Sequence, residues 1–243
     1  MQGGRLQRLI GFQDDVRLSF GWNYSDDLDS AKSMEGAFKE DVPYGVERWS
    51  LDSRSRCLEE ICAELATCDK LVIIGAAVEQ QQLSEIDFSN TAVIAADGSV
   101  GAMLDFESLT CIVSDLDGGE HIDFAASKSQ RFVIHAHGDN GSRWQKVLDN
   151  WSAFSNPPSL VLSHQTNESL QGMHNFGGFT DGDRAVCFAL WAGVTEDKIE
   201  LVGFSTQKVG VWSGATNPKT KMKKLSWMKK ILSFLNLEGQ IKD

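Results

Sequence analysis

The stretch HAHGDN, residues 135–140, places two histidines, an aspartate and an asparagine directly after the apolar run QRFVI. Side chains of these types bind metal ions or phosphate groups, or they satisfy the polar end of a strand. Asp115 and Asp117 stand in a similar position in SDLDGG, after the run LTCIV, and Asp97 follows the run TAVIAA. Acidic and polar groups thus follow three apolar runs, a pattern that burial alone does not require.

The D-x-D spacing of Asp115 and Asp117 favours a hard divalent cation. In an extended segment, residues two apart point to the same side, so both carboxylates would face one ligand. Magnesium prefers oxygen ligands and is typically held by one or two carboxylates together with substrate phosphates. The alternative is that each aspartate only caps the helix that follows it. We predict a Mg²⁺ site at Asp115 and Asp117.

The two histidines leave zinc as an alternative. His135 and His137 share one face of the predicted strand, and HAHGDN approximates the H-x-H-x-D-H string of metallo-β-lactamase-like hydrolases, with Asn140 in place of the last histidine. A catalytic zinc usually has three close protein ligands, so His164 or His174 would have to contribute. The abundant carboxylates favour a harder ion. A zinc hydrolase therefore stays the second hypothesis for this segment.

The apolar runs predict a doubly wound, mostly parallel α/β sheet of the Rossmann-like type. Such strands are nearly all apolar because helices cover both faces, and helical connections imply parallel pairing. Ligands of these sheets bind beyond the carboxyl ends of the strands, where the acidic groups lie. Helices are predicted over 142–154 and 183–193. The predicted strands are KLVIIG, TAVIAAD, LTCIVSD, QRFVIHAH, SLVLSHQ and KIELVGF.

The chain divides by pattern into two parts. Residues 1–67 show no buried strand and predict a small, mostly helical N-terminal region, with helices over 27–40 and 53–68. Residues 68–243 predict the α/β domain and a C-terminal helix. That helix carries one apolar stripe, formed by Leu225, Met228, Leu232 and Leu235. We expect the stripe to pack on the sheet, with a membrane surface as the alternative.

Composition excludes several classes of partner. The chain has 243 residues, a net charge of −11 and a pI near 4.9, which argues against nucleic-acid binding because that needs clustered lysine and arginine. Five cysteines without a CxxC pair are typical of reduced cytoplasmic thiols. We find no secretory leader and no apolar run of the ~20 residues that cross a bilayer. We expect a soluble cytoplasmic protein, and its seven tryptophans leave room for a homo-oligomer interface.

The glycine-rich segment NFGGFTDGDR, residues 175–184, is a further candidate for ligand binding. Neither a P-loop nor a G-x-G-x-x-G motif follows the first strand, where the sequence is GAAVEQQ. Gly177, Gly178 and Gly182 allow close backbone approach. A helix that starts near Asp183 would present N–H groups to a phosphate or a heterocycle. A plain loop is the alternative.

Taken together, these motifs resemble one family. AADG, SDLDG, HAHGDN, NFGGFTDGDRAV and the late K-x-K-x-K-K-L occur, over most of residues 70–232, in the order of the archaeal 6-hydroxymethyl-7,8-dihydropterin diphosphokinase family. The chain is also similar to thiamin pyrophosphokinase. The resemblance implies transfer of diphosphate from ATP to the hydroxymethyl group of a reduced pterin, with Mg²⁺ and release of AMP, in tetrahydrofolate or tetrahydromethanopterin biosynthesis. Thiamin or another hydroxymethyl heterocycle is the alternative acceptor.

The resemblance implies that Asp97, Asp115, Asp117 and Asp139 lie at comparable strand ends. From the reaction it implies, we assign roles to individual residues, with Asp97 either at the metal or at the nucleotide. The residues expected to hold Mg²⁺ and act in catalysis are Asp115, Asp117 and Asp139, with His137 at the attacking hydroxyl. Those expected at the ATP are Asp97, Gly98, Asn140, Arg184, Lys221 and Lys224. Those expected at the pterin are Gln165, Asn175, Phe176, Gly178, Phe179, Asp181 and Asp183. Two segments depart from the family pattern: GAAVEQQ lacks the second glycine and the proline of the first turn, and SHQ stands where T-T-Q is expected.

Overall fold

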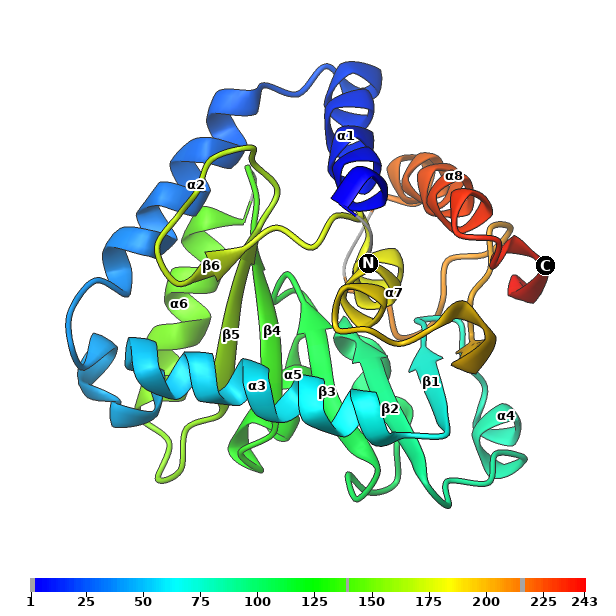
Figure 1. Ribbon diagram of the computed structural model, residues 1–243, viewed down its shortest axis with the longest axis horizontal. Coiled ribbons are helices and arrows are strands. Elements are labelled where there is room, and N and C mark those ends of the chain that lie inside the picture. Colours follow the sequence, from blue (N-terminus) through cyan, green and yellow to red (C-terminus); the bar gives the residue numbers. More distant parts are fainter. Residues whose placement is uncertain (1–2, 139, 215–216) are drawn as a thin grey trace.

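A seven-stranded sheet forms the centre of the protein. The computed structural model describes residues 3–138, 140–214 and 217–243. The strands are β1 Lys70–Ile74, β2 Thr91–Ala96, β3 Leu109–Ser114, β4 Arg131–Ala136, β5 Ser159–His164, β6 Met173–His174 and β7 Ile199–Val202. Their order is β6-β5-β4-β3-β2-β1-β7, and neighbours pair in parallel (Figure 1). The predicted doubly wound α/β fold is confirmed, and so are all six predicted strands.

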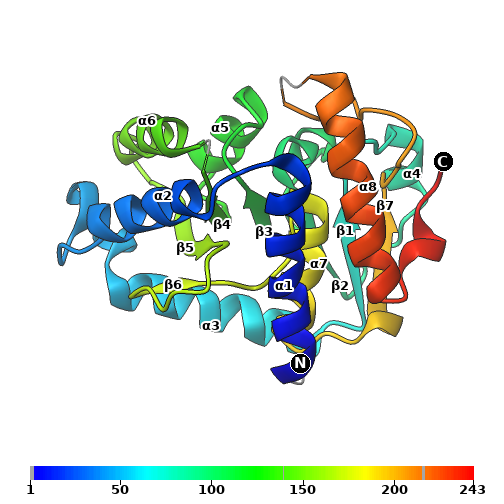
Figure 2. The same ribbon diagram turned by 90° about the horizontal axis from the view of Figure 1, so that it is seen from above.

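Helices cover both faces of this sheet. They are α1 Gly3–Phe20, α2 Tyr24–Ala37, α3 Leu51–Thr67, α4 Gln80–Ser84, α5 Glu120–Ser127, α6 Gly141–Ser152, α7 Asp181–Trp191 and α8 Pro218–Phe234. Short 3₁₀ helices occupy Pro43–Gly45, Glu47–Trp49, Asp97–Ala102, Glu196–Lys198 and Glu238–Gln240. Viewed from above, α1, α3, α7 and α8 lie on one side of the sheet, and α2, α5 and α6 on the other (Figure 2).

The core has two halves, one on each face of the sheet. In β1, Leu71 and Ile73 belong to one half and Val72 and Ile74 to the other, as the alternation of side chains along a strand requires. Both faces of every central strand are therefore buried, which explains why the strands read as continuous apolar runs.

The N-terminal helices share these two cores. Helix α1 was not predicted, because Gly3, Gly4 and Gly11 lower helix propensity. Packing of its apolar side chains against α8, in the core half that also contains α7, outweighs that cost. Helix α2 contributes to the opposite half of the core. A division of the chain after residue 67 falls between α3 and β1, and it stays a proposal about domains.

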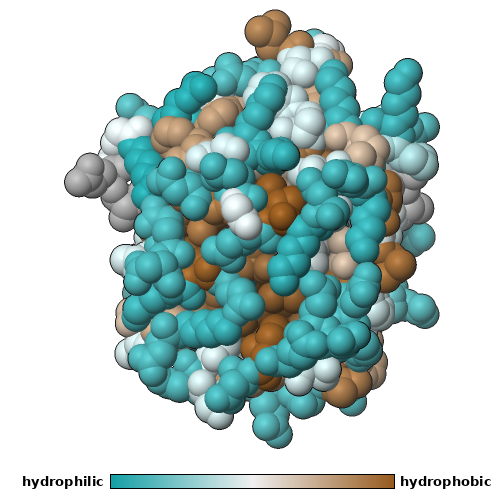
Figure 3. Space-filling model, turned by 90° about the vertical axis from the view of Figure 1, so that its right-hand side faces the viewer, coloured by the Kyte–Doolittle hydropathy of each residue, from teal (hydrophilic) through white to brown (hydrophobic). Residues whose placement is uncertain are grey.

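The last helix packs on the protein as predicted. Leu225, Met228, Leu232 and Leu235 are all buried in the core half that contains α7. Figure 3 shows the face that lies to the right in Figure 1: hydrophilic side chains cover most of it, and smaller apolar areas show between them. Among the described residues, every helix is too short or too polar to cross a membrane.

Strands β1 and β7 define the topological switch point of the sheet. The chain leaves β1 toward α4 on one face and leaves β7 toward α8 on the other. The two strand ends approach closely: Gly75 N–H donates to Val202 O at 2.8 Å and Ala77 N–H to Gly203 O at 2.9 Å. Gly203 has a φ of +74°, and a Cβ there would lie 2.3 Å from Val78 N. In open α/β sheets the crevice at such a point binds ligands.

Candidate active site

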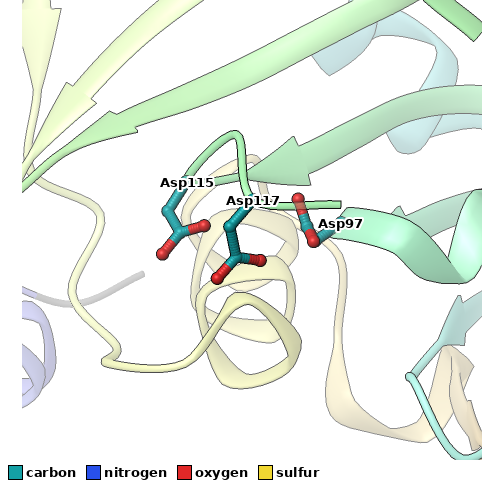
Figure 4. A group of neighbouring side chains, drawn as sticks. All are labelled: Asp97, Asp115 and Asp117. Carbon is teal, nitrogen blue, oxygen red and sulfur yellow. The ribbon is translucent and has the colours of Figure 1, made fainter. Parts of the chain in front are cut away.

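Three carboxylates meet at the carboxyl ends of β2 and β3. Asp97 begins the 3₁₀ helix after β2, and Asp115 and Asp117 follow β3. One oxygen from each lies within 4.8 Å of the other two, and Asp117 lies between its neighbours (Figure 4). The structure thus brings together, at the carboxyl ends of two parallel strands, three aspartates that we had selected from the sequence.

The backbone at these strand ends is turned rather than extended. Strand β3 stops at Ser114, and Leu116 takes a φ of +68° instead of the extended conformation that the D-x-D interpretation assumed. Ser114 fixes this turn, because its Oγ accepts from Leu116 N–H at 2.8 Å and donates to Asp97 Oδ1 at 2.5 Å. Asp97 itself has a φ of +50°. Such conformations cost about 1–3 kcal/mol each and cluster at functional sites.

The HAHGDN segment supports Asp115. His137 Nε2 lies 3.0 Å from Asp115 Oδ2. The fully buried Asn140 donates to the main-chain oxygens of Asp115, at 3.1 Å, and His135, at 2.7 Å, and accepts from His137 N–H. Asn140 therefore fixes the loop and does not face a ligand. Asp139 lies outside the described residues, and its metal role stays a prediction.

The cluster carries more negative charge than its surroundings neutralise. Burial, followed by the charges of Asp181, Asp117 and Asp115, raises the pKa of Asp97 well above its usual value. Burial and then Asp115 raise the pKa of Asp117. The pKa of Asp115 is lowered instead: burial opposes ionisation, but the hydrogen bond and charge of His137 outweigh it. A bound cation would relieve this repulsion.

The donor set fits a hard cation. Among the described residues, Asp115 Oδ1 is buried without a hydrogen-bond partner, which is costly unless another group, such as a metal, contacts it. The three clustered ligands are all carboxylates, the ligand type of Mg²⁺ rather than of zinc. His135 is buried inside the sheet, where its Nδ1 lies 3.1 Å from Ser163 Oγ. These positions favour the magnesium hypothesis over zinc.

Asp181 should make the metal-free protein sensitive to pH. Burial and the charges of Asp115 and Asp117 raise the pKa of Asp181 to about 7. Because the folded state binds this proton more tightly than the unfolded state, the ionised carboxylate destabilises the fold above pH 7, and the penalty shrinks as the pH falls toward 4.

Asp181→Asn should therefore raise the melting temperature of EDTA-treated protein by roughly 2–4 °C at pH 8 and by less at pH 5. Thermal unfolding followed by circular dichroism measures this. Mg²⁺ at pH 8 should stabilise the unmodified protein more than the variant. An equal rise in melting temperature at pH 5 and at pH 8 would show that ionisation of Asp181 is not the cause of the stabilisation.

Two pockets meet at the carboxylates. The aromatic pocket has an empty volume of about 910 Å³ including open space, and residues that characterise it are Trp22, Asp27, Asp115, His137, Gln165, Phe179, Arg184 and Lys224. The switch-point pocket has about 570 Å³, and residues that characterise it are Gly75, Ala76, Asp97, Gly182, Gly203, Phe204, Lys208 and Trp212. The border shared by both consists of Asp117, Thr180, Asp181, Gly214 and Lys221.

Among the described residues to which the sequence analysis assigned a role at the metal, the ATP or the pterin, ten line these pockets and six do not. Gly98 packs against the carbonyl of Trp212, where a Cβ would lie 2.5 Å away. Asn175 hydrogen-bonds with Gln13, and the Phe176 ring packs against Phe188 and Trp191. Asp183 caps α7 by accepting from Thr180 N–H at 3.0 Å. Gly178 and Asn140 are buried supports. We therefore expect these six residues to support the site rather than to contact ligands.

Several pocket residues were missed in the sequence. Trp22, Asn23, Asp26 and Asp27 come from the junction of α1 and α2, which the sequence did not predict. Arg143, in the first turn of α6, lies 3.9 Å from Asp117 and 4.0 Å from Asp115. The acidic pair at 26–27 was the only sequence feature that could have indicated these pocket residues. Such a pair is equally typical of the solvated face of a helix.

The fold and the site define a class of protein: a doubly wound α/β protein of the kind whose ligands bind beyond the strand ends, with three carboxylates there that could hold a divalent cation. No protein-family model matches the chain. Curated relatives do match it, however. The Pyrococcus furiosus protein named 6-hydroxymethyl-7,8-dihydropterin pyrophosphokinase is 36% identical over 182 residues, which cover 71% of this chain and 74% of that protein.

Two methanogen proteins carry the same name. The Methanocaldococcus jannaschii protein is 31% identical over 64% of this chain and 66% of its own length, and the Methanothermobacter thermautotrophicus protein is 33% identical over 62% and 65%. The chain belongs to the 6-hydroxymethyl-7,8-dihydropterin pyrophosphokinase family. The family resemblance seen in the motifs is thus confirmed.

Proposed function

We propose that the protein transfers the diphosphoryl group of ATP to the hydroxymethyl group of 6-hydroxymethyl-7,8-dihydropterin and releases AMP. Family membership supports the reaction and both substrates. The observation that carries the proposal is the border that two pockets share, because it includes Asp117 and Asp181 and lies beside Asp97 and Asp115. Two substrates bound in the two pockets would meet at that border.

The reaction exchanges one P–O bond for another. The hydroxyl oxygen of the pterin forms a bond to the β-phosphorus of ATP, and the bond between that phosphorus and the oxygen bridging to the α-phosphate breaks. AMP leaves with the bridging oxygen, and the hydroxyl proton passes to solvent. Such transfers depend mainly on positioning and on fixed charges, so a strong general base is not required.

Asp97, Asp115 and Asp117 are the residues proposed to hold Mg²⁺, with Asp139 as a further ligand predicted from the sequence. When bound there, Mg²⁺ would neutralise negative charge on the polyphosphate of ATP and help to orient it. His137 keeps Asp115 in place through their 3.0 Å contact. We therefore assign His137 to positioning of the carboxylate.

Cationic side chains supply the remaining charge. Lys221 lines both pockets at the border, and Lys224 lines the aromatic pocket. Arg143 lies beside Asp115 and Asp117. A fixed cation at this position offsets the charge that develops on the departing phosphate oxygens. Arg184 is already engaged by Gln165 and by the carbonyl of Phe179, and serves as a rigid wall of the aromatic pocket.

An AMP-release assay tests the proposal. Purified protein with ATP and Mg²⁺ should form AMP with 6-hydroxymethyl-7,8-dihydropterin, and far less with thiamin or without an acceptor. AMP formation with thiamin but not with the pterin would move the function to the related thiamin reaction. ATP breakdown that ignores the acceptor would contradict transfer altogether.

A further inference from the structure

The two pockets beside the carboxylates differ in their walls. The switch-point pocket is formed largely by backbone, with Gly75 and Gly203 at the ends of β1 and β7 and the first turn of α7. The aromatic pocket instead combines the rings of Trp22 and Phe179 with buried polar side chains. A flat heterocycle is recognised by an apolar slot for its faces and a few fixed polar groups for its edge. The aromatic pocket has both.

The ring of Trp22 forms one wall of the aromatic pocket and stays partly exposed to solvent. Its ring stacks on that of Phe20, with centroids 4.4 Å apart and planes at 23°, and lies 6.1 Å from the ring of Phe179. The residue nevertheless keeps 39% of its surface exposed. Lys224 Nζ lies 5.8 Å from the Trp22 ring and 6.0 Å from the Phe179 ring. A planar ligand in this pocket would cover apolar surface that is otherwise exposed to water.

The polar wall of the same pocket is rigid. Asp27 is buried, and its Oδ1 accepts from Gly138 N–H at 2.8 Å and from Gln165 Nε2 at 2.6 Å. Its Oδ2 accepts from Arg17 at 2.6 Å. Gln165 in turn accepts from the buried Arg184. A carboxylate beside a guanidinium suits the edge of an aminopyrimidinone ring, which places N–H donors next to a carbonyl acceptor.

We infer that the aromatic pocket binds the acceptor heterocycle, that the switch-point pocket binds the nucleotide, and that Trp22, from the N-terminal helices, determines acceptor affinity. The inference rests on the proposed function and adds to it the assignment of the pockets. The hydroxymethyl group of the acceptor would then point to the border at Asp117 and Asp181, where the polyphosphate arrives from the other side.

Steady-state kinetics of Trp22 variants separate the two substrates. Trp22→Ala should raise the KM of the pterin about tenfold or more, because the heterocycle loses its stacking contact with an aromatic ring, and should leave the KM of ATP within about twofold. Trp22→Phe should restore most of the affinity. Leu18→Ala is the matched control, because Leu18 lies in the last turn of α1, four positions before Trp22, is 85% exposed and does not line the aromatic pocket; it should change neither constant.

Equilibrium binding gives a readout that needs no turnover. The fluorescence anisotropy of oxidised 6-hydroxymethylpterin, titrated with protein in Mg²⁺ and α,β-methylene-ATP, should show the same loss for Trp22→Ala. Turnover with an unchanged pterin KM and a raised ATP KM in Trp22→Ala would overturn the pocket assignment and leave the proposed function standing. Unmodified protein that binds the pterin but forms no AMP would overturn the proposed function, while the binding loss in Trp22→Ala would still support the pocket.

Discussion

Asp115→Asn and Asp117→Asn are each expected to lower kcat by about a hundredfold to a thousandfold, since a lost metal charge costs several kcal/mol in the transition state. Asparagine keeps the shape of the side chain but removes its charge. Both carboxylates belong to the cluster at the strand ends, and Asp115 Oδ1 has no other buried partner among the described residues. Rates measured across a Mg²⁺ titration should also show a weakened dependence on the metal.

Glu120→Gln is the matched control for these variants. Glu120 is an exposed carboxylate at the start of α5, three positions after Asp117, and it lies outside the cluster. Its replacement should leave both kcat and the Mg²⁺ dependence unchanged. If Asp115→Asn and Asp117→Asn behaved like Glu120→Gln, the metal assignment would be wrong. If only Asp115→Asn lost activity and its Mg²⁺ dependence stayed unchanged, a weakened contact between Asp115 and His137 would explain the result better than a lost metal ligand.

Asp27→Ala is expected to destabilise the fold by about 3 kcal/mol, near the lower end of what breaking a buried ion pair costs. The side chains of Asp27 and Arg17 are each 6% exposed, and removal of the carboxylate leaves Arg17, within the part of the chain that the structure describes, with the half-exposed Asp14 as its one ionic partner. Gly138 N–H and Gln165 also lose their acceptor. Urea unfolding followed by fluorescence or circular dichroism measures the change in the free energy of unfolding.

Two further variants identify the cause of that loss. Glu64→Ala breaks the more exposed pair of Arg131 and Glu64 and should cost less than about 1 kcal/mol. The double variant Arg17→Met with Asp27→Leu removes both buried charges and should recover much of the stability lost in Asp27→Ala. Equal costs for Asp27→Ala and Glu64→Ala, or no recovery in the double variant, would show that the unpaired charge of Arg17 is not the cause of the lost stability.

Burial determined which parts of the fold were predictable. The six predicted strands are buried on both faces, so their apolar runs are continuous and easily recognised. Strand β6 has two residues, too few for any pattern. Helix α1 contains three glycines and exists because Leu9, Phe12 and Val16 pack against other helices. Helices of this kind depend on contacts that are remote in sequence and that local propensity does not encode.

The same limit applies to the site. The carboxylates after β2 and β3 were found because parallel strands end at one edge of the sheet. Trp22 and Asp27 were missed because the break between α1 and α2 meets that edge only in three dimensions. Conversely, Phe176 has a side chain suited to a heterocycle but lies in the core. A residue type shows what chemistry is possible, and only packing shows whether the side chain faces a ligand.

Product analysis is the direct test of diphosphoryl transfer from ATP to the pterin. The unmodified protein is incubated with ATP, Mg²⁺ and 6-hydroxymethyl-7,8-dihydropterin, and nucleotides and pterins are separated and identified by mass spectrometry. We expect one AMP and one pterin diphosphate for each ATP consumed, without ADP. ADP together with a pterin monophosphate, or AMP with free pyrophosphate and unchanged pterin, would contradict it.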